Sequence, residues 1–587
     1  MKRFVLIALG YFVLSAIQLQ SFAQVQSQPN PDSVRQQRAR MIKTATEAYE
    51  HRVFTHQDSL RGSVTLERAW WDVLRYDISI QPDFEDQSTR GSNEITYKVL
   101  DALQPAMQID LKAPLSVDSI IAGENQSLNF TREGNVWHVH TPKYAVGTVQ
   151  HLKVYFHGHP VIAVRPPWDG GWTFTRDEQG NPWMTVCCQG AGASLWYPCK
   201  DHQSDEPDQG ASLTMIAADS LVAVAGGHLV NRRKTKDGLI STKYEIQNPI
   251  SNYCIIPYIG KYDSFKETYP GLDGPLHIEY DVLPEHLKEA RTYLPEQVHY
   301  MLKSMEYWFG PYPFYKDGYK LVEVQHTGME HQSAVAYGNH YGFGYRGRDL
   351  SGTGWGSKWD FIIVHESGHE WFGNNITTRD LADMWVHESF ANYSETLYVE
   401  YRWGKAAGNE YNFGIRKNIV NDRPVIPRYG VNESGSGDMY YKGSNMLHAI
   451  RHSMNNDSLF RKILIGLNRH FYHQTVTGQQ IQDYISKRAG FNYQPVFDQY
   501  LKTTQIPVLQ LRFNADSSKV EYRWHNCIDN FNLPLALASG TDKNNTVLKL
   551  YPTTAWQRTS IQKADRALVN SESIIHNYYI ETDFSSE

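Results

Sequence analysis

Two histidines four residues apart, with a glutamate directly after the first, lie in an apolar stretch of this chain. The run is His365-Glu366-Ser367-Gly368-His369, within residues 361–372. On a helix with 3.6 residues per turn this spacing places both imidazoles on one face, one turn apart. Two imidazoles so placed can bind one Zn²⁺, while Glu366 lies beside the metal and can hold a water that the metal acidifies. The sequence therefore predicts a helix over residues 358–372, which Gly373 can end as a C-cap, with a metal site on one face.

A third ligand is expected from the next predicted helix. Glu388 is separated from His369 by eighteen residues and lies in a helical pattern over residues 384–403. The apolar stripe of that pattern consists of Val386, Phe390, Tyr393, Leu397 and Tyr401. Two helices packed along this stripe can bring Glu388 to the metal. Three protein ligands and one open position are the arrangement of a catalytic zinc site rather than a closed structural site.

Composition limits the class of protein. The chain has 587 residues, 20% of them charged and 41% hydrophobic, so it can bury a large core and should contain several domains. Its formal net charge of -6 provides no basic field for nucleic acid. The five cysteines would permit disulfides in an exported chain, but their odd number leaves at least one thiol unpaired or bonded between chains. Cys187, Cys188 and Cys199 lack the paired C-x-x-C spacing of a zinc site and are predicted to be small buried hydrophobic residues.

The first 23 residues have the features of an export signal. Lys2 and Arg3 precede an apolar run over residues 4–17, and Ser21-Phe22-Ala23 fits a cleavage site before Gln24. The run is shorter than the roughly 20 apolar residues that span a bilayer. We therefore expect an exported protein, periplasmic or secreted, without stable membrane insertion.

The pattern along the rest of the chain changes twice. After a polar extension (24–65), short alternating runs separated by turn residues predict a β domain (66–264). Helical spacing with one strand near residues 319–325 predicts a mainly helical domain (265–505). Alternation returns over 508–513 and 520–524, which predicts a small β-sandwich (506–587).

The two metal-site segments together resemble the aminopeptidase N family of gluzincin zinc peptidases. The family pattern is HExxH, eighteen residues, and then a glutamate followed by a small-Phe-Ala segment, and the chain keeps all of it through Glu388-Ser389-Phe390-Ala391. The resemblance implies that His365, His369 and Glu388 are the ligands of one Zn²⁺ per chain. It also implies that Glu366 is the general base.

A second stretch, Thr327-Gly328-Met329-Glu330-His331, looks like the family's Gly-x-Met-Glu-Asn motif on an edge strand. The resemblance implies that Glu330 binds the free α-ammonium of the substrate and that Gly328 and Met329 also belong to the substrate-binding segment. The chain departs from the motif at both ends, with Thr327 for Gly and His331 for Asn. The departure concerns backbone contacts to the substrate, not the charge pairing.

Two further segments are similar to family segments. Met439-Tyr440-Tyr441-Lys442-Gly443 is similar to Tyr-Glu-Lys-Gly, and its register places Tyr440 on the catalytic tyrosine, although the adjacent Tyr441 is an alternative. A phenol there can donate a hydrogen bond to the oxyanion, a contact typically worth about 3 kcal/mol. In the β domain, the segment at Cys188-Gln189 resembles the one whose glutamine helps to bind the amine, which implies that role for Gln189.

The resemblance implies a multidomain α+β fold: a β-rich saddle domain, a thermolysin-like zinc catalytic domain over residues 265–505, a small C-terminal β-sandwich, and no C-terminal helical solenoid. The expected function is that of a zinc-dependent aminopeptidase acting on peptides with a free N-terminus. Two alternatives stay open: a gluzincin endopeptidase with an open cleft, and an inactive zinc-containing protein that binds peptide or glycan.

Overall fold

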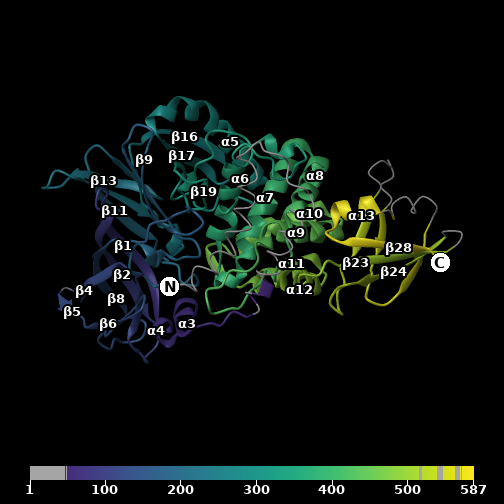
Figure 1. The fold of residues 1–587 in the computed structure, drawn as a ribbon, viewed down its shortest axis with the longest axis horizontal. Coiled ribbons are helices and arrows are strands. Elements are labelled where there is room, and N and C mark those ends of the chain that lie inside the picture. The colour runs from purple at the N-terminus through teal and green to yellow at the C-terminus, as the bar shows by residue number, and fades with distance from the viewer. Residues whose placement is uncertain are drawn as a thin grey trace.

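The structure is a computed structural model that describes residues 46, 47, 49, 51–123, 125–514, 518–538, 547–561, 569 and 571–586. Figure 1 shows a β-rich region, a helical region and a small C-terminal region following one another along the longest axis. The multidomain α+β fold expected from the sequence is therefore confirmed. The predicted signal peptide (1–23) lies outside the described residues. Within the described part of the chain, no helix is both long and apolar enough to cross a membrane.

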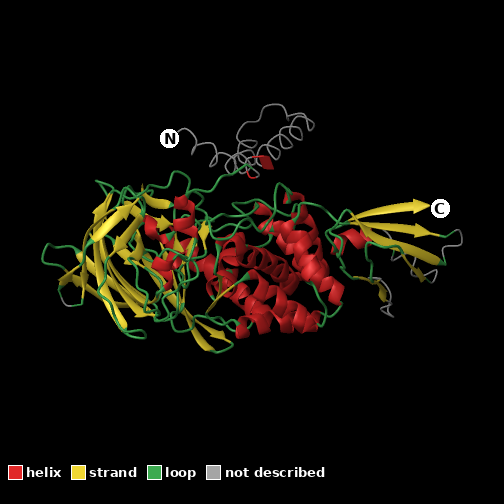
Figure 2. Ribbon diagram, turned by 90° about the horizontal axis from the view of Figure 1, so that it is seen from below, coloured by secondary structure: helices red, strands yellow, loops and turns green. Residues whose placement is uncertain are grey.

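The β-rich region is built on a wide sheet, seen in yellow in Figure 2. In sheet order its strands are β13 (His228–Lys234), β14 (Ile240–Ile246), β11 (Ala211–Ala217), β1 (Trp71–Asp83), β2 (Ser88–Val99), β8 (Val149–Gly158), β4 (Ser116–Ala122) and β5 (Gln126–Ser127). The alternation of apolar residues in β1 predicts that one face of the strand is buried. Tyr76, Ile78 and Ile80, which share that face, are all buried.

Two smaller sheets complete this region. One contains β12 (Val222–Val224), β15 (Tyr258–Gly260), β10 (Pro182–Cys187) and β9 (Gly171–Arg176), and the other contains β3 (Met107–Asp110), β7 (Val136–Val139) and β6 (Phe130–Glu133). The loop that carries Gln189 follows β10 directly. All five cysteines are free thiols; Cys187, Cys188 and Cys199 are buried, as predicted from the sequence, and Cys254 is buried as well.

A mixed five-stranded sheet adjoins the helices. Its order is β16 (Asp263–Gly271), β17 (Gly274–Val282), β18 (Tyr319–Glu323), β20 (Val335–Tyr337) and β19 (Gly328–Met329). Strands β17, β18 and β20 are parallel, and β19 pairs antiparallel with β20 at the edge. The boundary predicted between residues 264 and 265 falls inside β16, which pairs with β17 from Asp263 onward.

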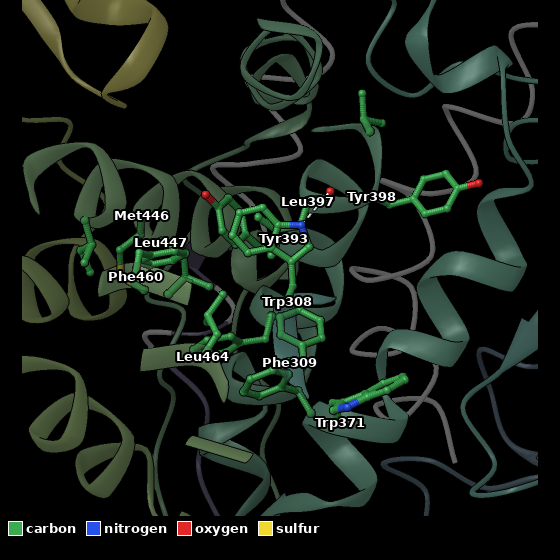
Figure 3. Close-up of a cluster of buried hydrophobic side chains, with 14 of the residues drawn as sticks. Trp308, Phe309, Trp371, Tyr393, Leu397, Tyr398, Met446, Leu447, Phe460 and Leu464 are labelled. Atoms are coloured by element: carbon green, nitrogen blue, oxygen red, sulfur yellow. Dashed lines mark hydrogen bonds between the residues drawn. The ribbon is translucent and has the colours of Figure 1, made fainter. Parts of the chain in front are cut away.

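The helical region packs around a core of aromatic and aliphatic side chains. Its helices are α5 (Leu287–Phe309), α6 (Phe361–Gly368), α7 (Trp385–Trp403), α8 (Lys405–Ile415), α9 (Tyr441–Met454), α10 (Asp457–His470), α11 (Gly478–Ala489) and α12 (Gln494–Lys502). Figure 3 shows Trp308 and Phe309 of α5 beside Tyr393 and Leu397 of α7 and Phe460 of α10. The indole of Trp308 donates to the Leu397 carbonyl at 3.2 Å, so the helices that surround the metal-site residues are tied together.

Helices α6 and α7 have the local signals that the sequence predicts. Asp360 caps the start of α6 by accepting from the Ile362 and Ile363 amides. After His369 the helix continues as a π-type turn and breaks at Phe372 and Gly373, where Gly373 has φ +132°. The predicted stripe of α7 is buried as far as Leu397, whereas Tyr401 is 40% exposed.

The C-terminal region contains a sheet with the order β27 (Gln557–Ser560), β24 (Lys519–His525), β23 (Val508–Phe513) and β28 (Glu581–Ser586), and a pair formed by β25 (Leu535–Ala538) and β26 (Val547–Leu550). A helix that the alternation did not predict, α13 (Ser571–Asn577), precedes β28. Arg416 of the helical region donates to the Ile575 and Tyr578 carbonyls, so it joins this region to α8.

Candidate metal centre and active site

The three predicted metal ligands converge on one point. His365 lies in the last turn of α6, His369 follows that helix, and Glu388 lies in the first turn of α7. Glu388 Oε2 is 3.9 Å from His365 Nε2 and 3.5 Å from His369 Nε2. The packing of α6 against α7 therefore brings together side chains separated by eighteen residues of sequence.

The donor set fits a zinc ion. Glu388 is 2% exposed, and its Oε2 atom makes no hydrogen bond to any described residue. A buried carboxylate oxygen that faces two imidazole nitrogens without a hydrogen-bond partner is costly unless a cation compensates it. Two imidazoles and one carboxylate are also a known ligand set of catalytic zinc. His365, His369 and Glu388 are thus the residues that would hold the ion.

The outer nitrogens of both histidines are fixed by hydrogen bonds. His365 Nδ1 lies 2.8 Å from Glu395 Oε1, and His369 Nδ1 lies 3.1 Å from the Phe372 carbonyl oxygen. Because each acceptor holds the proton on Nδ1, the Nε2 lone pair is left free to face Glu388. Glu395 is not among the site residues predicted from the sequence, although its position seven residues after Glu388 places both on one face of α7.

The centre concentrates negative charge. Burial alone would lower the pKa of His369, but the carboxylates of Glu330 and Glu388 raise it to about 10. Burial, together with Glu330 and Glu388, raises the pKa of Glu366 to about 7, against the attraction of the two imidazoles. A carboxyl group with a pKa near neutrality is suited to accept and return a proton. A bound dication would lower both pKa values.

Glu330 lies next to the metal ligands. One donor atom from each of Glu330, His369 and Glu388 falls within 4.8 Å of the others. The Glu330 Oε1 atom accepts hydrogen bonds from the Gln189 amide and from the Tyr253 hydroxyl, the latter at 3.1 Å. The pKa of Glu330 is raised by burial and by Glu388, although His369 opposes this. Tyr253, in a short turn of the β-rich region, carried no signal in the sequence.

Gln189 bridges two carboxylates. Its Nε2 atom donates to Glu330 Oε1 and, at 3.4 Å, to Glu388 Oε1. Gln189 comes from the loop after β10, whereas Glu330 follows β19 and Glu388 lies in α7. The structure therefore completes the site with a side chain from the β-rich region.

Edge strand β19 places Gly328 against Glu366. A Cβ atom at Gly328 would lie 2.9 Å from Glu366 Oε1 and 2.7 Å from Ile362 Cγ2, so a side chain would displace the glutamate or the helix. The Met329 side chain instead belongs to the buried core of the β-rich region. Only the backbone of Met329 is therefore available at the sheet edge.

The departure of the sequence at His331 has a structural reason. Its ring is fully buried, and Nδ1 lies 2.6 Å from the Tyr258 hydroxyl, which itself donates to the Ala334 carbonyl. Burial keeps the pKa of His331 well below its usual value, so the ring stays neutral. His331 thus anchors the turn after Glu330 rather than the metal.

The structure distinguishes the two adjacent tyrosines. The Tyr440 ring centroid lies 6.0 Å from that of His365, and Tyr441 begins α9. Burial and the carboxylates of Glu388 and Glu330 raise the pKa of Tyr440 well above its usual value. For Tyr441 the carboxylate that acts on the phenol is Glu395, on the far side of His365 from the ligand cluster. Tyr440 is therefore the protonated phenol that faces the centre.

Comparison with known proteins shows what this chain is similar to. Residues 294–500 match the peptidase family M1 domain. Endoplasmic reticulum aminopeptidase 1 of Mus musculus is 24% identical over 316 residues, which are 51% of this chain and 33% of that protein. Aminopeptidase N of Lactococcus lactis is 26% identical over 169 residues, 27% of this chain and 20% of that protein. The chain thus spans a third or less of the length of these relatives.

Solved structures share the fold. A two-domain M1 zinc metallopeptidase bound to L-tryptophan aligns with a TM-score of 0.61 at 20% identity, covering 74% of this chain and 95% of that one. An M1 zinc metallopeptidase from Deinococcus radiodurans bound to a Tyr-Ser-Ala substrate aligns with a TM-score of 0.59 at 20% identity and the same coverage. The matched segment contains Glu330, both histidines, Glu388 and Tyr440. Residues 294–500 of this chain, which carry these side chains, are therefore similar to the peptidase family M1 domain.

Proposed function

We propose that this chain is a zinc-dependent aminopeptidase that hydrolyses the N-terminal peptide bond of peptides. The observation that carries the proposal is the position of the Glu330 carboxylate, whose oxygen lies within 4.8 Å of the donor atoms of His369 and Glu388. A substrate ammonium paired with Glu330 puts the first carbonyl of the peptide beside the metal ligands. The first peptide bond is then the one that is cut.

Different side chains carry out the remaining steps of the reaction. Bound zinc would polarise the substrate carbonyl and acidify a water. Glu366 takes the proton of the attacking water and returns it to the leaving amine. The Tyr440 phenol donates a hydrogen bond to the oxyanion, and Glu330 with Gln189 binds the ammonium.

The same geometry disfavours an endopeptidase. A chain that continued past the N-terminal residue would place an uncharged amide against the buried Glu330 carboxylate, leaving that charge unpaired. A mutant of the M1 zinc metallopeptidase from Deinococcus radiodurans binds a Tyr-Ser-Ala substrate, which supports a peptide substrate here.

The test is turnover of a panel of free aminoacyl reporters by the chain, with and without a chelator. We expect turnover that the chelator abolishes and zinc restores. The variant Glu366→Gln should retain zinc and lose turnover, because only the proton acceptor is removed. Turnover that resists the chelator, or persists in Glu366→Gln, would contradict the proposal.

We also propose that the protein is exported and acts in the periplasm or outside the cell, on the basis of the signal-like residues 1–23. Protein recovered from outside the cytoplasm should begin at Gln24. An unprocessed N-terminus at Met1 would contradict this.

A further inference from the structure

Residues 52–63, here called the strap, contact two loops that border the active site. We propose that the strap fixes the loops at the side of the active site where Glu330 and Gln189 bind the substrate ammonium, here called the amine end, and so keeps that side closed. Arg61 is the positioning residue through which the strap acts. This inference rests on the proposed aminopeptidase function for its consequence, but its structural part can be tested separately. These residues fall within the polar extension (24–65) predicted from the sequence.

The strap has a defined structure. Its helix α3 (His56–Gly62) begins with a reciprocal capping box: the Asp58 amide donates to Thr55 Oγ1, and the Thr55 amide donates to Asp58 Oδ2 at 2.8 Å. Arg61 lies in the last turn of this helix.

Arg61 binds the loop that carries Gln189. Its guanidinium donates to the Asp201 carbonyl and, at 3.4 Å, to the Ala191 carbonyl, and it lies 3.3 Å from Asp201 Oδ2. Gly192 packs so closely that an added Cβ would lie 2.0 Å from Arg61 Nη2. The Asp201 carboxylate also accepts from the Ala193 and Ser194 amides. Lys112 Nζ donates to the same Ala191 carbonyl. Arg61, Lys112 and Asp201 therefore fix the turn that begins at Gln189.

The opposite side of the strap lies on the loop that leads to Tyr440. The Ser63 hydroxyl donates to the Gly430 carbonyl at 2.6 Å, and Arg52 pairs with Glu433 at 3.1 Å. Gly62 lies against this loop, because a Cβ there would be 2.1 Å from the Asn432 amide nitrogen. The strap thus contacts a loop from each of the two regions that build the site.

These two loops also meet each other at the amine end. Asn432 Nδ2 donates to the Gly190 carbonyl at 3.1 Å, while the neighbouring Gln189 donates to Glu330 and Glu388. The loop after β10 therefore runs from the amine-binding carboxylate to the loop at Asn432. A peptide extending beyond its N-terminal residue would have to displace it. Without Arg61 this loop keeps the Lys112 contact but loses the guanidinium that binds both Ala191 and Asp201, so recognition of the amine should weaken while the metal ligands stay in place.

Kinetics of Arg61→Ala and Arg61→Lys test the functional consequence. For Arg61→Ala we expect KM for a free aminoacyl reporter to rise about tenfold, with kcat within about twofold, because binding rather than chemistry is affected. The preference for free over N-acetylated peptide should fall by the same factor. Arg61→Lys keeps the charge but loses the forked donor, so its KM should lie between those of the parent chain and Arg61→Ala. The matched control is Arg176→Ala, since Arg176 also binds a carbonyl and a carboxylate, Gly180 and Glu85, away from the site.

Hydrogen exchange tests the strap without any activity. In Arg61→Ala, amides in residues 186–196 and 428–436 should exchange faster than in the parent chain, and the control should match the parent. If Arg61→Ala does not fold, Arg61→Lys and Asn432→Ala are measured instead. The inference would be overturned if the folded Arg61 variant showed both amide hydrogen exchange and KM at the values of the parent chain. A parent chain without aminopeptidase activity would refute the proposed function, whereas the exchange result would still decide whether the strap holds the loop.

Discussion

The proposed amine recognition makes a quantitative prediction for Glu330→Gln. The carboxylate is 3% exposed and lies among metal ligands, so a substrate ammonium pairs with it away from water. Two unit charges 4 Å apart interact by about 4 kcal/mol at an effective dielectric constant of 20. Removing one partner of such a buried pair typically costs about 2–5 kcal/mol. We therefore expect about 3 kcal/mol, which is about 150-fold in kcat/KM for a free peptide.

The assay is a cycle of two enzymes and two substrates. The parent chain and Glu330→Gln are each measured on a peptide with a free N-terminus and on its N-acetylated form. Acetylation should cost the parent about 150-fold in kcat/KM and the variant less than about tenfold, because the carboxylate that needs a cation is gone. Glu306→Gln is the matched control: Glu306 is also buried and accepts a tyrosine hydroxyl, that of Tyr315 at 3.0 Å. An acetylation penalty that is the same in parent and variant would refute the reasoning.

Three further predictions concern residues around the metal centre. Tyr440→Phe should lower kcat about 100-fold with little change in KM, since the phenol acts on the oxyanion, and Tyr441→Phe should change kcat less than about threefold; equal losses would contradict the assignment. Gly328→Ala should lower kcat while leaving zinc content unchanged, because the new methyl group would crowd Glu366 Oε1, 2.9 Å from its Cβ position; parent-like kcat would contradict this. Activity requires ionised Glu366, whose pKa of about 7 the bound cation lowers, so the acid limb of the kcat/KM profile should lie below about pH 7; an acid limb with its midpoint at pH 8 or above would contradict it.

The parts of the site that the sequence could predict are those set by local helical geometry. The spacing of His365 and His369 fixes their common face, and the apolar stripe of α7 explains how Glu388 reaches them. Glu395 was predictable on the same ground, from its spacing to Glu388, but was missed. The turn before α9 places the Tyr440 ring near Glu388 and Glu330 and the Tyr441 ring near Glu395. The choice between the two tyrosines depends on this turn.

Other features depend on contacts between distant segments, for which the sequence carries no periodic signal. Tyr253 reaches Glu330 across 77 residues, and Arg61 reaches Ala191 across 130. The predicted boundary between residues 264 and 265 falls inside β16, because the alternation of this strand resembles that of the preceding domain while its pairing partner β17 belongs to the next. Helix α13 lies within a stretch that otherwise alternates.

The central claim is that His365, His369 and Glu388 hold one zinc ion. The most direct measurement is the zinc content per chain after extensive dialysis, together with zinc affinity by titration of the chelator-treated protein. The parent should hold one zinc per chain, and His369→Ala and Glu388→Ala should lose it on dialysis, while Glu366→Gln and Tyr440→Phe retain it. A parent chain that takes up no zinc, or a Glu388→Ala variant that binds it as tightly as the parent, would contradict the account.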